Sequence, residues 1–271
     1  MIPLPPIAVI FLTSRCNMVC RFCATDNSVS SMTFEEALAL LLFLKKEKVS
    51  CVVFGGGEPF VWKHDFLLIT QKAKEMGFVV QVGTNGISMP DGFENIDSID
   101  RYVLPIDSMD AAIHNHLRNY PKKEHLSIIL ERLEKLRGTG RSVTISTVVN
   151  RTNLENLPEI ANFLHNYNHD GGLVHAWHLY RFIPEGRGGR LSAGQLAIDL
   201  EIYHQVCDEL KRKNPHLVIY KRPNMYSSKT VDFYWYSKHK LMVGSQPFGR
   251  PVRSNLSEPM AIERSLLSEL L

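Results

Sequence analysis

Three of the five cysteines in this chain of 271 residues lie within eight positions, as Cys16, Cys20 and Cys23 in the stretch CNMVCRFC. Thiolates are common ligands of zinc and of iron–sulfur clusters. A structural zinc site needs about four protein ligands, and the sequence has no second C-x2-C pair to supply them. Three thiolates on a 4Fe–4S cluster would leave one iron open to an outside ligand. The spacing therefore favours a cluster, with zinc or incidental cysteines as the alternatives.

A second stretch whose residues could take part in binding or chemistry is GGGEP, at residues 55–59. Glycines at the end of a strand let a ligand approach the backbone closely, and Glu58 adds an acceptor next to them. The alternative is an ordinary glycine turn with a solvated glutamate. The two remaining cysteines, Cys51 and Cys207, fall on a strand and on a helical face and read as core residues.

These residues need a scaffold that brings loops together, and the pattern of the chain provides one. Short β-branched runs alternate with longer amphipathic segments, which is typical of a parallel sheet with crossover helices. An open, partial barrel and a doubly wound sheet both fit, and both place chemistry at the carboxyl ends of the strands. We expect strands at 7–13, 51–55, 78–84, 101–107, 141–149 and 175–183, helices at 33–48, 64–76, 124–138, 153–167 and 195–213, and a short extra helix at 109–118.

The character of the sequence changes after IPEGRGGR, residues 183–190. We expect a core over 1–190 and a C-terminal extension over 191–271 that packs on the core and covers its mouth. Within the extension, a strand at 216–220 and a strand or hairpin at 232–243 are expected.

The C-x3-C-x2-C spacing, with Phe22 just before the last cysteine, resembles the cluster loop of the radical S-adenosylmethionine (SAM) superfamily. The resemblance covers about residues 7–190. It implies an α/β fold, a partial (β/α)6 TIM-like barrel with parallel strands, and one 4Fe–4S cluster on Cys16, Cys20 and Cys23. It also implies that the open iron chelates SAM and that one electron cleaves SAM to a 5′-deoxyadenosyl radical, which abstracts a hydrogen atom. The electron would come from a flavodoxin or a ferredoxin.

The resemblance extends to residues that would contact SAM. GGGEP is similar to the family's GGE motif, TNG at 84–86 suggests a ribose contact, and IDSMDAAIHNHLR at 106–118 resembles the viperin-like branch in its carboxylate-binding serine and arginine. Each stretch also has a plain reading, as a turn, a helix cap or a surface arginine. The implied SAM contacts are Gly56, Gly57, Glu58, Asn85, Ser108, Arg118, Ser146 and Asn150.

The sequence indicates neither the substrate nor which residue, if any, donates or accepts a second hydrogen atom. We expect a ring of polar and basic side chains at the mouth, suited to an anionic substrate unless it is a solvated loop, and aromatic residues that line the mouth or form a plain core hairpin. The alternatives are a viperin-like nucleotide-modifying enzyme, a glycyl-radical activating enzyme, and a non-enzymatic metal-binding scaffold. The ring would contain His178, Tyr180, Arg181, Arg187 and Arg190, and the aromatic set Tyr226, Tyr234, Trp235 and Tyr236.

Bulk composition sets the remaining expectations. A net charge of +3 is too small to indicate nucleic acid. The longest purely apolar run, 37–44, is far short of a membrane span, and the start of the chain lacks the basic segment of a signal peptide. Five cysteines without a disulfide-like spacing fit a reducing compartment, so we expect a cytoplasmic protein.

Overall fold

A computed structural model describes residues 5–224, 230–237 and 240–244. Within these residues one sheet runs in the order β7-β6-β5-β4-β3-β2-β1-β8-β9. All neighbours pair in parallel except β8 and β9, which form an antiparallel hairpin. The strands are β1 (Ile7–Thr13), β2 (Cys51–Gly56), β3 (Val79–Gly83), β4 (Arg101–Pro105), β5 (Val143–Val149), β6 (Val174–Arg181), β7 (Ile219–Arg222), β8 (Val231–Ser237) and β9 (Lys240–Gly244).

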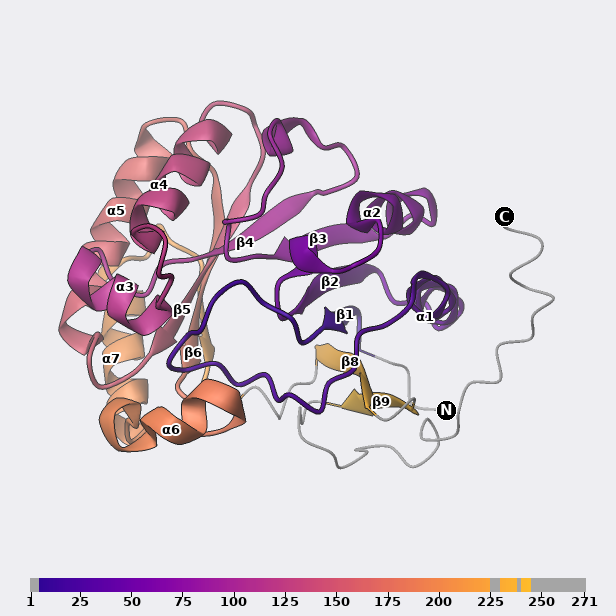
Figure 1. Cartoon of the computed structure of the whole chain (residues 1–271). Coiled ribbons are helices and arrows are strands. Elements are labelled where there is room, and N and C mark those ends of the chain that lie inside the picture. Colours follow the sequence, from indigo (N-terminus) through magenta and orange to yellow (C-terminus); the bar gives the residue numbers. More distant parts are fainter. Residues whose placement is uncertain (1–4, 225–229, 238–239, 245–271) are drawn as a thin grey trace.

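The helices follow the strands in an α/β alternation, and most of them cover one side of the curved sheet, which makes a partial TIM-like barrel (Figure 1). This arrangement confirms the barrel and not the doubly wound sheet. The helices are α1 (Phe34–Lys46), α2 (Phe66–Glu75), α3 (Ala111–Arg118), α4 (His125–Leu136), α5 (Leu157–His169), α6 (Gly186–Leu196) and α7 (Leu200–Lys213), with single 3-10 turns η1 (Pro59–Val61), η2 (Phe93–Asn95) and η3 (Leu154–Asn156).

Local sequence explains several of these elements. Thr33 and Glu36 form a reciprocal capping box at the start of α1, and lysines occupy its last turn. The main core lies between the sheet and the helices, where alternate strand residues such as Ile10, Val52 and Ile145 are fully buried. Burying these side chains is the main stabilising contribution to the fold.

The chain after β6 differs from the expected pattern in two ways. The helix expected at 195–213 forms as α7, which begins at Leu200, and a further helix, α6, begins inside the glycine-rich stretch, where the sequence predicts none. Glycine is a poor helix former, so the local sequence does not predict this helix. The boundary expected at residue 190 therefore falls within α6.

The expected strand and hairpin of the extension both form, and they join opposite edges of the sheet. Strand β7 pairs with β6, whereas β8 pairs with β1. The described part of the extension therefore lengthens the sheet at both edges. That the extension also covers the mouth stays a prediction, because 245–271 lie outside the described residues.

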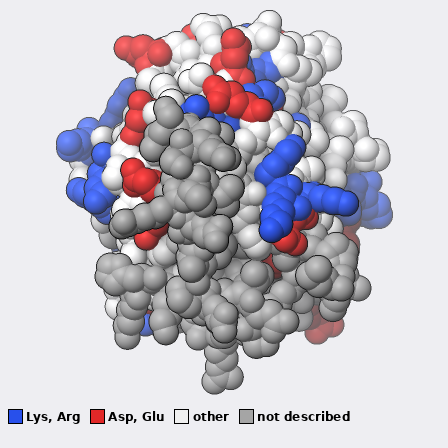
Figure 2. All heavy atoms as spheres, turned by 90° about the vertical axis from the view of Figure 1, so that its right-hand side faces the viewer, with Lys and Arg blue, Asp and Glu red and all other residues white. Residues whose placement is uncertain are grey.

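Surface charge and helix character agree with the bulk composition. On the face shown in Figure 2, described Lys and Arg side chains are interspersed with Asp and Glu. Among the described helices, none is both long enough and apolar enough to cross a lipid bilayer.

Candidate cofactor site

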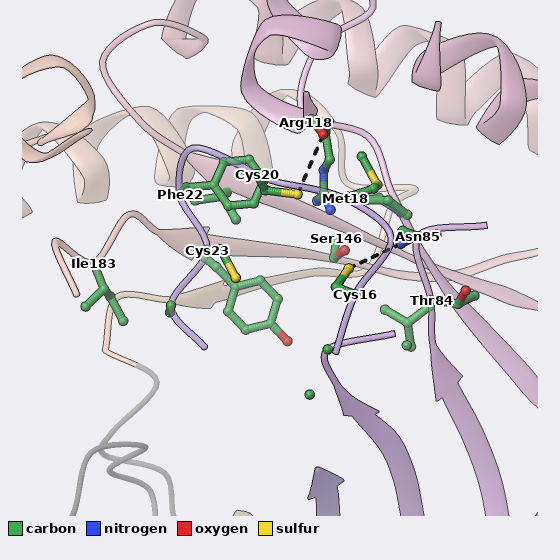
Figure 3. A pocket seen from close by; sticks show the side chains of 18 of the residues that line it. Cys16, Met18, Cys20, Phe22, Cys23, Thr84, Asn85, Arg118, Ser146 and Ile183 are labelled. Atoms are coloured by element: carbon green, nitrogen blue, oxygen red, sulfur yellow. Dashed lines mark hydrogen bonds between the residues drawn. The ribbon is translucent and has the colours of Figure 1, made fainter. Parts of the chain in front are cut away.

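A cavity of about 300 Å³ lies at the carboxyl ends of the central strands. Its wall contains the side chains of Cys16, Cys20 and Cys23, all from the loop between β1 and α1. Figure 3 shows the three sulfur atoms around this cavity, with Asn85 beside Cys16 and Arg118 beside Cys20. The topology thus brings residues from several strand ends to the cysteine loop, as the sequence predicts.

The three thiols do not form a site for a single ion. Among the described residues, no group of three or more His, Cys, Asp and Glu side chains is arranged to hold one metal ion. A cluster differs from a single ion in that each thiolate binds a different iron atom, so sulfur atoms spread around a cavity suit a cluster better than zinc. Burial raises the pKa of Cys20 to about 12 and also raises that of Cys16, so metal binding here would displace protons.

The end of β2 holds one side of the cysteine loop. The amides of Gly57 and Glu58 donate to the carbonyl oxygens of Thr13 and Arg15, at 2.7 and 2.8 Å. A Cβ at position 57 would lie 2.0 Å from the carbonyl oxygen of Arg15, so only glycine fits. The GGGEP stretch is therefore explained in part by close packing between two backbones.

Helices α3 and α6 hold the other side of the loop. The amide of Arg21 donates to the carbonyl of Leu117 in α3 at 2.9 Å, and the amide of Gly188 in α6 donates to the carbonyl of Cys23 at 3.0 Å. A Cβ at position 188 would lie 2.3 Å from the carbonyl oxygen of Cys20. Gly186 and Gly188 of α6 therefore allow its close contact with the cysteine loop, which sequence reasoning missed.

Glu58 is placed behind the cavity wall and not on it. Its side chain is fully buried, and its carboxylate accepts hydrogen bonds from Thr84 Oγ1 and the Asn85 amide, both at 2.7 Å, and from the Phe60 amide at 3.2 Å. Burial raises the pKa of Glu58 to about 7, against the opposing effect of these hydrogen bonds. The carboxylate of Glu58 therefore fixes the loop that carries Asn85, and its expected direct contact with SAM stays a prediction.

Asn85 lies on the cavity wall, where its Nδ2 donates to Asn17 Oδ1 at 2.6 Å and approaches Cys16 Sγ at 3.6 Å. Its amide side chain thus reaches the cysteine loop directly.

Arg118 also lies on the wall and is held by a carboxylate that sequence reasoning overlooked. Its Nε donates to Asp107 Oδ2 at 2.6 Å, and its guanidinium lies 4.8 Å from the centre of the Phe22 ring. Asp107 is fully buried and also accepts from the Val148 amide. A signal was present in IDSMDAAIHNHLR, where an acid ends a strand and an arginine ends the following helix.

A pair of buried histidines connects the Arg118 and Asn85 regions. The Asp107 amide donates to His114 Nδ1, His114 Nε2 lies 2.8 Å from His125 Nδ1, and His125 Nε2 lies 2.7 Å from the Asn85 carbonyl oxygen. Burial lowers the pKa of both histidines to about 3. The pair is therefore neutral near pH 7 and forms a continuous hydrogen-bonded link between the ends of β3 and β4.

Of the other expected SAM contacts, only some reach the cavity. Gly56, Gly57 and Ser146 line it. Ser108 is fully buried and its Oγ accepts from the Asp110 amide, while the Asn150 side chain stabilises the turn after β5 by accepting from Thr152. Both side chains have local partners and neither lines the cavity, and their direct contacts with SAM stay predictions.

Of the polar and basic residues expected to form a ring at the mouth, again only some line the cavity. Arg181 and Arg187 line the cavity together with Tyr180, whereas His178 lies deeper on β6 and exposed Arg190 pairs with Asp26. Arg181 is engaged by the carbonyl groups of Pro223 and Ile198.

The aromatic set belongs to the core. Tyr234 and Tyr236 pack in the main hydrophobic core, and Trp235 packs with Phe11 and Phe233. These three residues do not line the cavity, which supports the alternative of a plain core hairpin, and Tyr226 lies outside the described residues.

Comparison with known sequences gives one family match, to the Radical SAM superfamily, over residues 10–164. Relatives include a protein of Methanocaldococcus jannaschii named as a glycyl-radical enzyme activating enzyme, 27% identical over 59% of this chain and 64% of that protein. The tungsten-containing aldehyde ferredoxin oxidoreductase cofactor-modifying protein of Pyrococcus furiosus is 26% identical over 60% of this chain and 49% of that protein. This chain thus matches less than two thirds of the length of either relative.

Solved structures share the fold at low sequence identity. SuiB of Streptococcus suis bound to S-adenosylmethionine aligns with a TM-score of 0.66 and 14% identity, over 88% of this chain and 58% of that one. The protein anSMEcpe with bound AdoMet aligns with a TM-score of 0.62 and 16% identity, over 79% and 64% of the two chains. Both comparisons support the partial barrel.

Proposed function

The chain belongs to the radical SAM superfamily, and from that premise we propose that it binds one 4Fe–4S cluster and SAM in the cavity, cleaves SAM reductively and abstracts a hydrogen atom from a substrate. Members of this superfamily are enzymes that use these two cofactors. When bound, the cluster and SAM together supply a 5′-deoxyadenosyl radical after one electron arrives from outside. All other tasks fall to the chain.

The residues of the cavity fit this pair of cofactors. Cys16, Cys20 and Cys23 supply three sulfur ligands from one loop and leave one iron for SAM. Arg118 has a planar fork of donors that can bind the SAM carboxylate while Asp107 holds its Nε. We assign the other contacts with SAM to the backbone at Gly56 and Gly57 and to the side chains of Asn85 and Ser146.

The buried polar groups behind the wall keep these contacts in place. Glu58 fixes the Asn85 loop, and the His114–His125 pair ties that loop to the segment that carries Asp107. Such support limits the movement of groups that must orient a reactive cofactor.

The single observation that carries the proposal is that three cysteines of one loop share a cavity with Asn85 and Arg118 from other strand ends. The names of the relatives describe different reactions, so we assign no specific substrate from them. A glycyl-radical activating enzyme remains the second candidate, because one relative carries that name. The reductant, a flavodoxin or ferredoxin, and the cytoplasmic location stay predictions.

The test is to reconstitute the protein with iron and sulfide without oxygen, add SAM and dithionite, and measure 5′-deoxyadenosine by mass spectrometry. We expect product from the wild type and from Cys51→Ala, which removes a buried thiol outside the cavity. We expect none from Cys20→Ala. No product from the wild type, or equal product from Cys20→Ala, would contradict the proposal and favour a metal-binding scaffold.

A further inference from the structure

The concave face of the sheet continues from the cavity onto β6 and β7. Along β7, Ile219 packs in the main core and Lys221 pairs with Asp208 of α7, so both point toward the helices. Because side chains alternate along a strand, Tyr220 and Arg222 point to the other side of the sheet. Contacts with β6 confirm this direction, since the Tyr220 ring lies 5.3 Å from the His178 ring.

The strand register joins these residues to the cofactor cavity. Tyr180, which lines the cavity, pairs with Arg222, and His178 pairs with Tyr220. The Nδ1 of His178 lies 3.3 Å from the Tyr180 hydroxyl, and the Arg222 guanidinium lies 5.4 Å from the centre of the Tyr220 ring. A group bound at Arg222 would therefore be next to the cavity wall and separated from it by one side chain.

Arg222 pairs with no charged or carbonyl group among the described residues. The Nε of Arg101 donates to a hydroxyl, that of Ser142, but Arg101 begins β4 and so lies at the amino end of its strand, away from the cavity. The guanidinium contact of Arg222 is the Tyr220 ring, whereas Arg118 pairs with Asp107 and Arg190 with Asp26. Arg181 and Arg187 donate to backbone carbonyl groups. Arg222 is thus a cation beside the cavity wall that is available to a ligand.

The wall around Arg222 favours an anion over a cation. The concave-face residues of β4 to β7 are basic, aromatic, hydroxyl-bearing or apolar, and these described positions include no Asp or Glu. Burial lowers the pKa of His178 to about 4, with a further contribution from the positive charge of Arg222, so His178 is neutral near pH 7 and free to exchange a hydrogen bond. The residues in question are Arg101, Val103, Pro105, Thr144, Ser146, Val148, Ala176, His178, Tyr180, Tyr220 and Arg222.

We propose that Arg222, flanked by Tyr220 and His178, binds an anionic group, a carboxylate or a phosphate, of the substrate. A half-buried guanidinium beside aromatic rings suits a planar or tetrahedral oxyanion. The rings provide apolar surface for the part of the substrate that leads toward the cavity. Calling the ligand a substrate rests on the proposed function. The existence of an anion site at Arg222 does not rest on it.

The test measures anion binding to the protein loaded with cluster and SAM, by calorimetry without oxygen. The probes are benzoate, inorganic phosphate, and benzamide as the neutral analogue of benzoate. We expect the wild type to bind benzoate or phosphate, to bind benzamide more weakly, and to lose at least about tenfold in anion affinity in Arg222→Gln. Which of the two anions binds more tightly distinguishes a carboxylate from a phosphate substrate.

Lys221→Gln is the matched control, because it removes one positive charge from the neighbouring residue on the opposite side of the sheet. It should bind the anions as the wild type does, and Arg222→Lys should retain part of the affinity. No measurable binding of either anion, equal affinity in Arg222→Gln, or an equal loss in Lys221→Gln would overturn the proposal.

Cleavage of SAM in these variants separates this inference from the proposed function. Arg222→Gln should still form 5′-deoxyadenosine from SAM when no substrate is added. Anion binding that depends on Arg222 in a protein that does not cleave SAM would support the site and contradict the proposed function. SAM cleavage without Arg222-dependent anion binding would support the proposed function and overturn the anion site.

Discussion

Arg187 donates a hydrogen bond from its Nε to the Sγ of Cys23, at 3.3 Å. The same guanidinium donates from Nη1 to the carbonyl oxygen of Ser14 at 2.8 Å. Helix α6 therefore contributes to the cysteine loop both through its backbone and through a positive charge placed on a proposed ligand sulfur. Sequence reasoning assigns Arg187 to the mouth, and the structure gives it this more specific position.

Arg187→Gln should lower the reduction potential of the cluster. A cation that donates to a ligand sulfur stabilises the reduced, more negative state, so its removal makes reduction harder. Each tenfold change in the one-electron equilibrium corresponds to about 60 mV. A redox titration followed by electron paramagnetic resonance measures this shift, with Arg190→Gln on the same helix as control. An unchanged or higher potential, or an equal shift in Arg190→Gln, would contradict the assignment.

Gly188→Ala should loosen the contact between α6 and the cysteine loop. The new Cβ would lie 2.3 Å from the Cys20 carbonyl oxygen, so one backbone must move, at a cost of about 1–3 kcal/mol. We expect less iron per chain after reconstitution than in the wild type. Gly194→Ala is the control in the same helix, because no atom lies within 4 Å of its Cβ position. Full iron loading in Gly188→Ala would show that this packing is dispensable.

Arg118→Lys should weaken SAM binding while leaving the cluster in place. Lysine keeps the charge but loses the planar fork, and loss of a charge-assisted hydrogen bond costs about 1.5–3 kcal/mol, or at least about tenfold in affinity. Calorimetry with SAM and an iron assay measure the two quantities. Arg137→Lys is a close control, since Arg137 also pairs with acids and lies over an aromatic ring, but on the helix side of the sheet. If Arg118→Lys binds SAM with wild-type affinity, Arg118 does not make the proposed contact with the SAM carboxylate.

Glu58 should make stability fall as the pH rises. Its pKa is raised from 4.5 to about 7 in the folded chain. The contribution of the protonated carboxyl group to the free energy of unfolding is therefore complete below about pH 4.5 and is lost as the pH rises through 7. The shift corresponds to about 3 kcal/mol. Glu58→Gln resembles the protonated acid and does not titrate, so its melting temperature relative to the wild type should increase by several degrees between pH 5 and pH 8. A difference that is constant with pH would contradict this role.

The sequence was sufficient for the sheet and for the identity of the cysteine loop. Each of the first six strands forms where its β-branched run predicts, because such runs are buried on both faces of a parallel sheet. The close spacing of Cys16, Cys20 and Cys23 also places them on one cavity. In both cases the information is local, carried by a continuous run or a single loop.

The remaining errors concern contacts between residues far apart in the chain. Helix α6 was missed because its glycines disfavour a helix locally, while the tight packing of Gly186 and Gly188 against the cysteine loop compensates. For Glu58, spacing alone could not show that Thr84 and Asn85 donate hydrogen bonds to its carboxylate. Arg222 was overlooked because only the β6–β7 register shows that it follows Tyr180 onto the concave face.

The most direct test of the account is the electron paramagnetic resonance spectrum of the reduced, reconstituted protein before and after SAM is added. We predict the signal of one 4Fe–4S cluster per chain, which changes when SAM binds and is lost in Cys16→Ala, Cys20→Ala and Cys23→Ala but kept in Cys207→Ala. A cluster signal that SAM leaves unchanged, or one that survives in all three cavity variants, would contradict the proposal that these cysteines hold a cluster with an iron open to SAM.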